Sequence, residues 1–145
     1  MKAQSRRRDK RSNNRWVFAA PSAIHGRGLF ARREIPPGMD FVEYDGPRLP
    51  LRDARRIALE GNSYIFEFDR RTAIDGSVAW NLARHANHGC SPNSFSAKAD
   101  GRIWLRALRT IAKGEEITYD YGYRAQNHEE LPCRCGQPGC RGKLG

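Results

Sequence analysis

Hydrophobic residues in this chain occur in short runs of three to six positions, and most of the runs end at Gly, Pro, Asp or Asn. Short runs of branched and aromatic residues between turn-forming residues are typical of β-strands. The pattern therefore predicts a mainly β fold. The predicted strands cover residues 16–20, 28–31, 40–44, 63–68, 73–75, 95–98, 102–107 and 117–121.

Two turns and one helix complete the predicted elements. Asp100 and Gly101 separate two predicted strands, and an Asp-Gly pair readily adopts the positive φ angles of a two-residue hairpin. Gly114 predicts a second turn before the strand at 117–121. Helical periodicity is limited to residues 51–59. The apolar stripe of this helix consists of Leu51, Ala54, Ile57 and Ala58.

The length of 145 residues corresponds to a single domain, which excludes a two-domain enzyme with a separate cofactor fold. The net charge is +10, and residues 1–15 contribute +6 of it. Because residues 1–14 lack aromatic and branched aliphatic side chains, we expect a disordered basic arm there. Such an arm either contacts DNA or RNA or is merely solvated, and both interpretations stay open.

An acidic segment runs against the overall charge of the chain. Residues 114–131 carry a net charge of −4, with Glu115, Glu116 and Asp120 among the acidic residues. Opposite charges favour encounter, so this segment would suit a surface that faces a basic, lysine-bearing peptide. The alternative, which also stays open, is that its charges are only solvated.

No run of 18 or more apolar residues is present, so we expect no membrane span. The basic start is followed by only five apolar residues before Pro21, which is too few for a secretion signal. We therefore expect an intracellular protein, and the sequence does not distinguish a nucleus from a bacterial cytoplasm or nucleoid. In a reducing compartment, cysteines are expected to be free thiols or metal ligands.

The four cysteines predict a zinc site. Three of them lie within eight residues, among Pro and Gly residues that disfavour regular structure, and the fourth lies in a separate loop. Structural zinc is held by four ligands in a tetrahedron. We predict one structural zinc ion, which tethers the C-terminal residues onto that loop. The predicted ligands are Cys90, Cys133, Cys135 and Cys140.

Five motifs follow one another along the chain: GRGLFA at 26–31, EYDG at 43–46, RHANHGCSPN at 84–93, GEEITYDYG at 114–122, and CRCG to CRG at 133–142. Together and in this order they resemble the motifs of SET-domain protein lysine methyltransferases with a cysteine-rich, zinc-binding (post-SET) tail. The resemblance covers about residues 15–145. It implies a SET catalytic domain at 15–124 and a post-SET segment at 125–145.

The resemblance also implies a fold and a cofactor. The fold is a β-clip of several small sheets, in which the segment carrying Tyr121 threads under the loop carrying Asn87 and His88 in a knot-like crossing. The methyl donor is S-adenosylmethionine. The residues that the resemblance assigns to its binding are Gly26, Arg27, Gly28, Tyr44, Arg84, His85, Asn87, His88 and Tyr121.

Methyl transfer from a sulfonium to an amine needs alignment of the reactants and exclusion of water rather than a metal. Tyr119 and Tyr121 are two residues apart on a predicted strand and should point the same way. By resemblance Tyr121 is the catalytic tyrosine, and Tyr119 narrows the lysine channel and favours mono- or dimethylation. The lysine amine must be neutral to attack, and burial beside a sulfonium favours that form.

The sequence thus favours a protein-lysine N-methyltransferase that acts on a basic, histone-like protein. The alternative is a small zinc-containing protein that binds nucleic acid through the basic arm and has no catalytic activity. The two hypotheses differ in whether the protein binds the methyl donor. The sequence gives no expectation for the oligomeric state.

Overall fold

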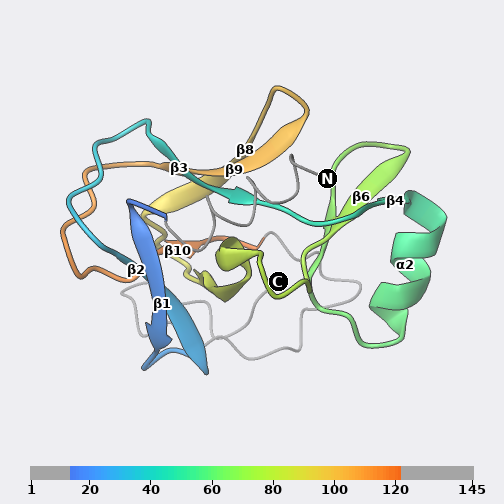
Figure 1. Ribbon diagram of the computed structural model, residues 1–145, viewed down its shortest axis with the longest axis horizontal. Coiled ribbons are helices and arrows are strands. Elements are labelled where there is room, and N and C mark those ends of the chain that lie inside the picture. The colour runs from blue at the N-terminus through green and yellow to red at the C-terminus, as the bar shows by residue number, and fades with distance from the viewer. Residues whose placement is uncertain (1–13, 122–145) are drawn as a thin grey trace.

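The computed structural model describes residues 14–121. In this part the chain forms four small sheets, with one α-helix and one short 3₁₀ helix (Figure 1). The mainly β class is therefore confirmed. Most of the predicted basic arm, and Cys133, Cys135 and Cys140, lie outside the described residues. The elements are β1 (Val17–Pro21), β2 (Arg27–Ala31), β3 (Asp40–Tyr44), β4 (Arg48–Pro50), α2 (Leu51–Leu59), β5 (Ile65–Glu67), β6 (Thr72–Asp75), the 3₁₀ helix η1 (Leu82–His85), β7 (Asn87–His88), β8 (Ser94–Ala99), β9 (Arg102–Ala107) and β10 (Thr118–Tyr119).

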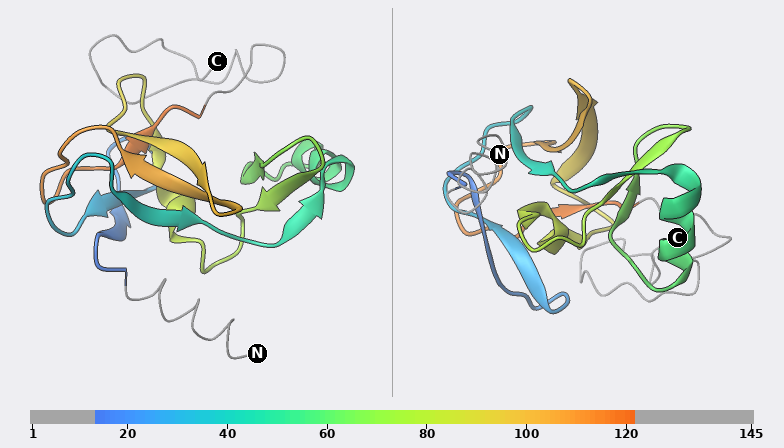
Figure 2. Two further views of the ribbon diagram at one scale, coloured as in Figure 1. Left: turned by 90° about the horizontal axis from the view of Figure 1, so that it is seen from above. Right: turned by 45° about the vertical axis from the view of Figure 1, so that its right-hand side comes forward.

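The four sheets follow a simple order. β1 and β2 form an antiparallel hairpin, β9 lies between β3 and β8, and β6 lies between β4 and β5. The fourth sheet is the parallel pair of β7 and β10. The β1–β2 hairpin and α2 lie at opposite ends of the molecule, as the views in Figures 1 and 2 agree. None of the helices in the described part is long and apolar enough to cross a membrane.

The hairpin between β8 and β9 has the predicted turn. Asp100 and Gly101 have φ angles of 54° and 72°, and Ala99 pairs with Arg102 across the turn. Alternation along β9 then buries Ile103, Leu105 and Ala107 and turns the residues between them outward. This strand supplies the centre of the core. The largest fully buried side chains are Leu29, Ile35, Ile103, Leu105, Ile111, Ile117 and Val17.

The predicted helix is confirmed as α2, with the predicted bounds. It contacts β4, β5 and β6 rather than the main core. Ala54 is fully buried, whereas Ala58 at the other end of the predicted stripe is exposed. The buried side of α2 is therefore narrower than the predicted stripe.

The first residue that the structure describes, Asn14, contacts the start of β1. Asn14, which the sequence analysis placed in the basic arm, accepts hydrogen bonds from the Trp16 and Val17 backbone N–H groups at 2.7 and 2.9 Å. Its side-chain amide donates to the Phe41 carbonyl at 3.2 Å. This side chain therefore fixes the entry into β1.

Three elements were not predicted from the sequence: β4, η1 and β7. β7 consists of Asn87 and His88 alone, and it pairs in parallel with β10, which is also two residues long. The strand predicted at 117–121 therefore forms only over Thr118–Tyr119. Parallel strands far apart in the chain are paired by tertiary contacts, which local sequence patterns do not report.

Buried side chains hold the segment before β10 in place. Asn93 is 2% exposed and accepts a hydrogen bond from the Thr118 N–H at 3.0 Å. Its amide donates to the Glu116 carbonyl at 2.8 Å, and the Ser94 hydroxyl donates to the Thr118 carbonyl at 2.7 Å. These contacts provide hydrogen-bond partners for backbone groups that the two-residue ladder of β7 and β10 does not pair.

We predict that Asn93→Ala lowers the free energy of unfolding by about 2–4 kcal/mol, because it leaves two buried backbone groups without partners. Urea denaturation of the full chain measures this. The control is Ser96→Ala on the exposed side of β8, which should change stability by less than about 0.5 kcal/mol. A loss below about 1 kcal/mol for Asn93→Ala would contradict the role given to this side chain.

Candidate active site

The two tyrosines at the end of the described chain lie side by side. Their ring centroids are 4.9 Å apart at an interplanar angle of 53°. Tyr119 is 8% exposed, and Tyr121 is partly buried against the core. The Tyr121 hydroxyl donates to the Ala86 carbonyl at 2.8 Å. The prediction that the two rings share a face is confirmed.

His88 connects the tyrosines to the neighbouring loop. It is 4% exposed, and its ring meets Tyr121 edge-on with 5.3 Å between centroids. The Tyr121 backbone N–H donates to His88 Nδ1 at 3.1 Å. In the neutral ring the proton therefore resides on Nε2, which lies 3.5 Å from Cys90 Sγ. One imidazole thus links the Tyr121 backbone to the cysteine that the sequence predicts as a zinc ligand.

Asn87 connects β7 to the turn between β1 and β2. Its side-chain amide nitrogen lies 3.2 Å from the His25 carbonyl and 3.3 Å from the Arg27 carbonyl. It also lies 3.0 Å from the carboxylate of Glu116 and 3.3 Å from the Ser22 hydroxyl. This polar centre brings together two of the predicted cofactor-binding motifs, residues 26–28 and 87–88.

Arg84 and His85 come from the 3₁₀ helix η1. The Arg84 guanidinium donates to the Ser77 carbonyl at 3.2 Å, and its Nε is buried with no acceptor among the described residues. Burial, followed by the positive charges of Arg84 and Arg27, lowers the pKa of His85 below its ordinary value. His85 is therefore neutral at pH 7.

Tyr44 lies at the end of β3 and is 4% exposed. Its hydroxyl donates to the Tyr64 carbonyl at 2.7 Å, and its ring centroid is 5.1 Å from that of Phe66. A Cβ on Gly76 would come within 2.4 Å of the Tyr44 ring, so this ring needs a glycine beside it. The structure thus gives Tyr44 packing partners between β3 and the sheet of α2, and its place in a cofactor site stays a prediction.

The remaining predicted cofactor-binding residues lie in the β1–β2 turn. Gly26 adopts a φ of 48°, a left-handed conformation that favours glycine. The exposed Arg27 donates to the Ala19 carbonyl at 3.3 Å. Gly28 is buried, and a Cβ at this position would come within 2.4 Å of the Glu116 carboxylate. The close neighbour of this second glycine is thus a side chain of the protein itself.

The SET domain family profile matches residues 26–122. The match includes the turn with the two glycines, the Asn-His pair and both tyrosines. The chain belongs to the SET domain family.

Curated relatives of this SET domain are much longer proteins. The chain is 39% identical over 142 residues to histone-lysine N-methyltransferase 2B of Homo sapiens, covering 91% of this chain and 5% of that protein. It is 38% identical over 135 residues to histone-lysine N-methyltransferase SETD1 of Drosophila melanogaster, covering 86% and 8%. It is 40% identical over 140 residues to the H3 lysine-4 specific histone-lysine N-methyltransferase of Saccharomyces cerevisiae, covering 88% and 13%.

The carboxylates of Glu115 and Glu116 are partly buried and hydrogen-bonded within this SET domain. Hydrogen bonding to Arg109, and then to Asn93, lowers the pKa of Glu115 to about 2. Glu116 accepts from the Ser22 hydroxyl and from the Asn87 amide. Both carboxylates thus have partners within the protein, and the interpretation that the acidic segment faces a basic peptide stays a prediction. Glu129 and Glu130 of the same acidic segment lie outside the described residues.

Sequence reasoning missed Glu116, Ser22 and Asn93 as residues of the site. Each is a common polar residue beside a turn or strand, and its role depends on partners more than 20 positions away in the chain. One signal was present: Gly28 predicts a close approach to the backbone, although the group that approaches it was not identifiable.

Of the predicted zinc ligands, the structure describes Cys90, which is partly exposed. No group of three or more metal-ligating side chains occurs within residues 14–121. The other three predicted ligands fall outside that range, so the zinc site stays a prediction.

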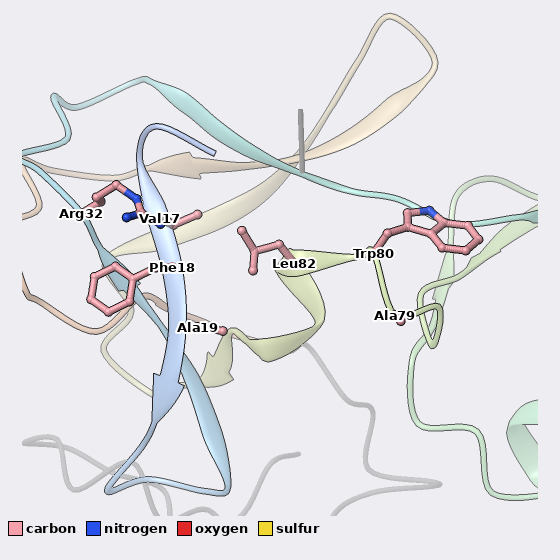
Figure 3. A pocket seen from close by; sticks show the side chains of 7 residues that line it. All are labelled: Val17, Phe18, Ala19, Arg32, Ala79, Trp80 and Leu82. Carbon is pink, nitrogen blue, oxygen red and sulfur yellow. The ribbon is translucent and has the colours of Figure 1, made fainter. Parts of the chain in front are cut away.

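A separate pocket lies on the side of β1. Val17, Phe18, Ala19 and Arg32 line one wall, and Ala79, Trp80 and Leu82 line the other (Figure 3). None of the predicted site residues lines this pocket. We assign no part of the SET chemistry to it.

Proposed function

We propose that this protein is a lysine N-methyltransferase that uses S-adenosylmethionine. The observation that carries the proposal is the paired phenols of Tyr119 and Tyr121, with the Tyr121 hydroxyl fixed on the Ala86 carbonyl. That hydroxyl donates its proton to the carbonyl, and a phenolic oxygen is also able to accept a hydrogen bond from an amine N–H. Membership of the SET domain family and the names of the curated relatives support the same activity.

The residues present fit the methyl donor. When bound, S-adenosylmethionine supplies a methyl group on a positively charged sulfur, together with an amino acid carboxylate. The buried Nε of Arg84, which has no acceptor among the described residues, suits a carboxylate partner. The lowered pKa of His85 favours its neutral form, which adds no positive charge to the predicted site. Gly26, Arg27, Gly28, Asn87 and His88 would complete the site.

The chain's own residues would then orient the amine and exclude water. The two aromatic rings offer an apolar channel, and burial disfavours the ammonium form of the lysine. A neutral amine can attack without a dedicated base. Alignment of the two reactants supplies most of the acceleration in such a displacement.

We propose a histone or a histone-like basic protein as the substrate, mono- or dimethylated because Tyr119 carries a hydroxyl. The relatives named histone-lysine methyltransferases support this substrate class, and the chain spans 5% to 13% of the length of the three relatives described above. A histone substrate places the protein inside the cell, on chromatin. Contact of the basic arm with DNA or RNA is part of the same proposal.

The first test is methylation of histone H3 by the full chain with radiolabelled S-adenosylmethionine. The wild type should label the histone, and Tyr121→Phe should reduce kcat by about 100-fold or more, because the amine loses the hydroxyl that orients it. Calorimetry with S-adenosylhomocysteine runs in parallel. No binding and no labelling, together with a steep loss of nucleic-acid affinity at higher salt, would instead support the non-catalytic alternative.

The second test concerns the degree of methylation. Tyr119→Phe should raise the highest methylation state of the product without abolishing turnover, because the channel loses a hydroxyl and gains room near the amine. Mass spectra of the histone product measure the distribution of states. An unchanged distribution would contradict the role proposed for Tyr119.

We also propose that one zinc ion is held by Cys90, Cys133, Cys135 and Cys140. The position of Cys90 supports this assignment, because His88 Nε2–H can donate to its sulfur at 3.5 Å. Hydrogen bonds from a neighbouring side chain commonly orient a metal-bound thiolate. The ion would supply folding energy and no step of the reaction.

Elemental analysis of the purified full chain should find one zinc ion per chain. Cys90→Ser should reduce the zinc content to less than about half and lower the unfolding temperature, because a tetrahedral site loses a ligand. Ser96→Ala serves as the control and should retain the ion. Wild-type protein without stoichiometric zinc would refute the proposed site.

A further inference from the structure

Glu116 lies on the same face of the chain as the glycines of the β1–β2 turn. Its backbone forms an antiparallel bridge with Phe30 in β2, and the Ile117 N–H donates to the Leu29 carbonyl at 2.7 Å. Residues paired across two strands have side chains on the same face, and so do residues two apart on one strand. Glu116 pairs with Phe30, so its side chain lies on the face of Gly28 and not on that of Leu29. Because Gly28 has no side chain, the Glu116 carboxylate occupies the space beside it.

The carboxylate of Glu116 is the common partner of two separate segments. The Ser22 hydroxyl donates to it at 2.8 and 3.0 Å from its two oxygens, and the Asn87 amide donates at 3.0 Å. Ser22 in turn belongs to the β1–β2 turn, where its hydroxyl accepts from the Ile24 N–H at 2.9 Å and its N–H donates to the Gly26 carbonyl at 2.9 Å. One carboxylate therefore ties the turn to β7.

This contact also fixes the orientation of the Asn87 amide. A carboxylate accepts hydrogen bonds and cannot donate them, so it must face the amide nitrogen. The carbonyl groups of His25 and Arg27 are acceptors as well and require the same orientation. The Asn87 amide oxygen is then directed away from all of these groups and remains an acceptor.

We propose that Glu116 is a positioning residue for the methyl donor. It acts through Asn87 and the β1–β2 turn. This inference rests on the proposed function, because it assigns S-adenosylmethionine to residues 26–28 and 87–88. Gly28 is part of the same arrangement. A glycine is needed at this position to leave room for the Glu116 carboxylate, and not for the donor itself. Glu116 does not touch the reacting atoms.

The experiment compares binding of S-adenosylhomocysteine to full-length variants by calorimetry, well below the unfolding temperature of each. Glu116→Ala should weaken binding by about 10-fold to 100-fold, because it removes a charged acceptor from buried donors. Glu116→Gln retains an oxygen for Asn87 and Ser22 and should bind within about 3-fold of the wild type. The matched control is Glu34→Gln, an exposed carboxylate in the loop after β2, which should leave binding unchanged.

A second set of variants tests whether Gly28 and Glu116 form one unit. Gly28→Ala should weaken binding about as much as Glu116→Ala, because the new Cβ displaces the carboxylate. The double variant should be no weaker than the weaker single variant, since coupled residues are not additive. Ser22→Ala, which removes one donor, should weaken binding by roughly 3-fold to 10-fold and covers the case that Glu116→Ala does not fold.

Turnover separates positioning from general structural damage. In Glu116→Ala the KM for S-adenosylmethionine should rise, while the KM for the histone substrate stays within about 2-fold. Three results would each overturn the inference while the wild type still binds and methylates: unchanged binding in Glu116→Ala and Ser22→Ala, equal losses in Glu116→Gln and Glu116→Ala, or additive losses in the double variant. Failure of the wild type to bind S-adenosylhomocysteine would refute the proposed function, and the inference with it.

Discussion

The site depends on how the segment at residues 115–121 is held beside β7. Only two residue pairs, Thr118 with Asn87 and Tyr119 with His88, form the parallel ladder. So short a ladder cannot satisfy the neighbouring backbone groups, and buried side chains do this instead. The Asn93 side chain accepts from the Thr118 N–H, and the Ser94 hydroxyl donates to the Thr118 carbonyl. His88 Nδ1 accepts from the Tyr121 N–H. The position of the two tyrosines is thus set by polar contacts in a buried environment, where an unpaired group is costly.

The same contacts explain which parts were predictable from the sequence. The Asp100-Gly101 hairpin, the strand at β9 and the bounds of α2 follow from local patterns, and all three were predicted. β7 was not, because an Asn-His pair has no strand propensity and its partner lies 31 positions further on. Strand and helix periodicity report burial of apolar side chains, whereas this pairing is fixed by polar ones.

For the candidate site, the sequence predicted the pair of aromatic rings but not the polar contacts around them. Two tyrosines at alternate positions predicted a shared aromatic face, and the structure has it. The partners of the Glu115 and Glu116 carboxylates were not predictable, because charge counted along a sequence does not show which way a side chain points. Arg109 and Asn93 hold one of them, and Ser22 and Asn87 hold the other.

Alternation along this segment also gives it two different sides. Glu116 faces the glycine turn, while Tyr119 and Tyr121, at odd positions, face each other beside Ala86. An in-line displacement requires that the donor and the amine be fixed relative to one another, and an error of 1 Å in that alignment can cost about 100-fold in rate. In the proposed site the residues for both reactants lie on one stretch of six residues, 116–121, so that no flexible connection separates them. The short ladder and its buried polar contacts would then be a condition for alignment as well as for stability.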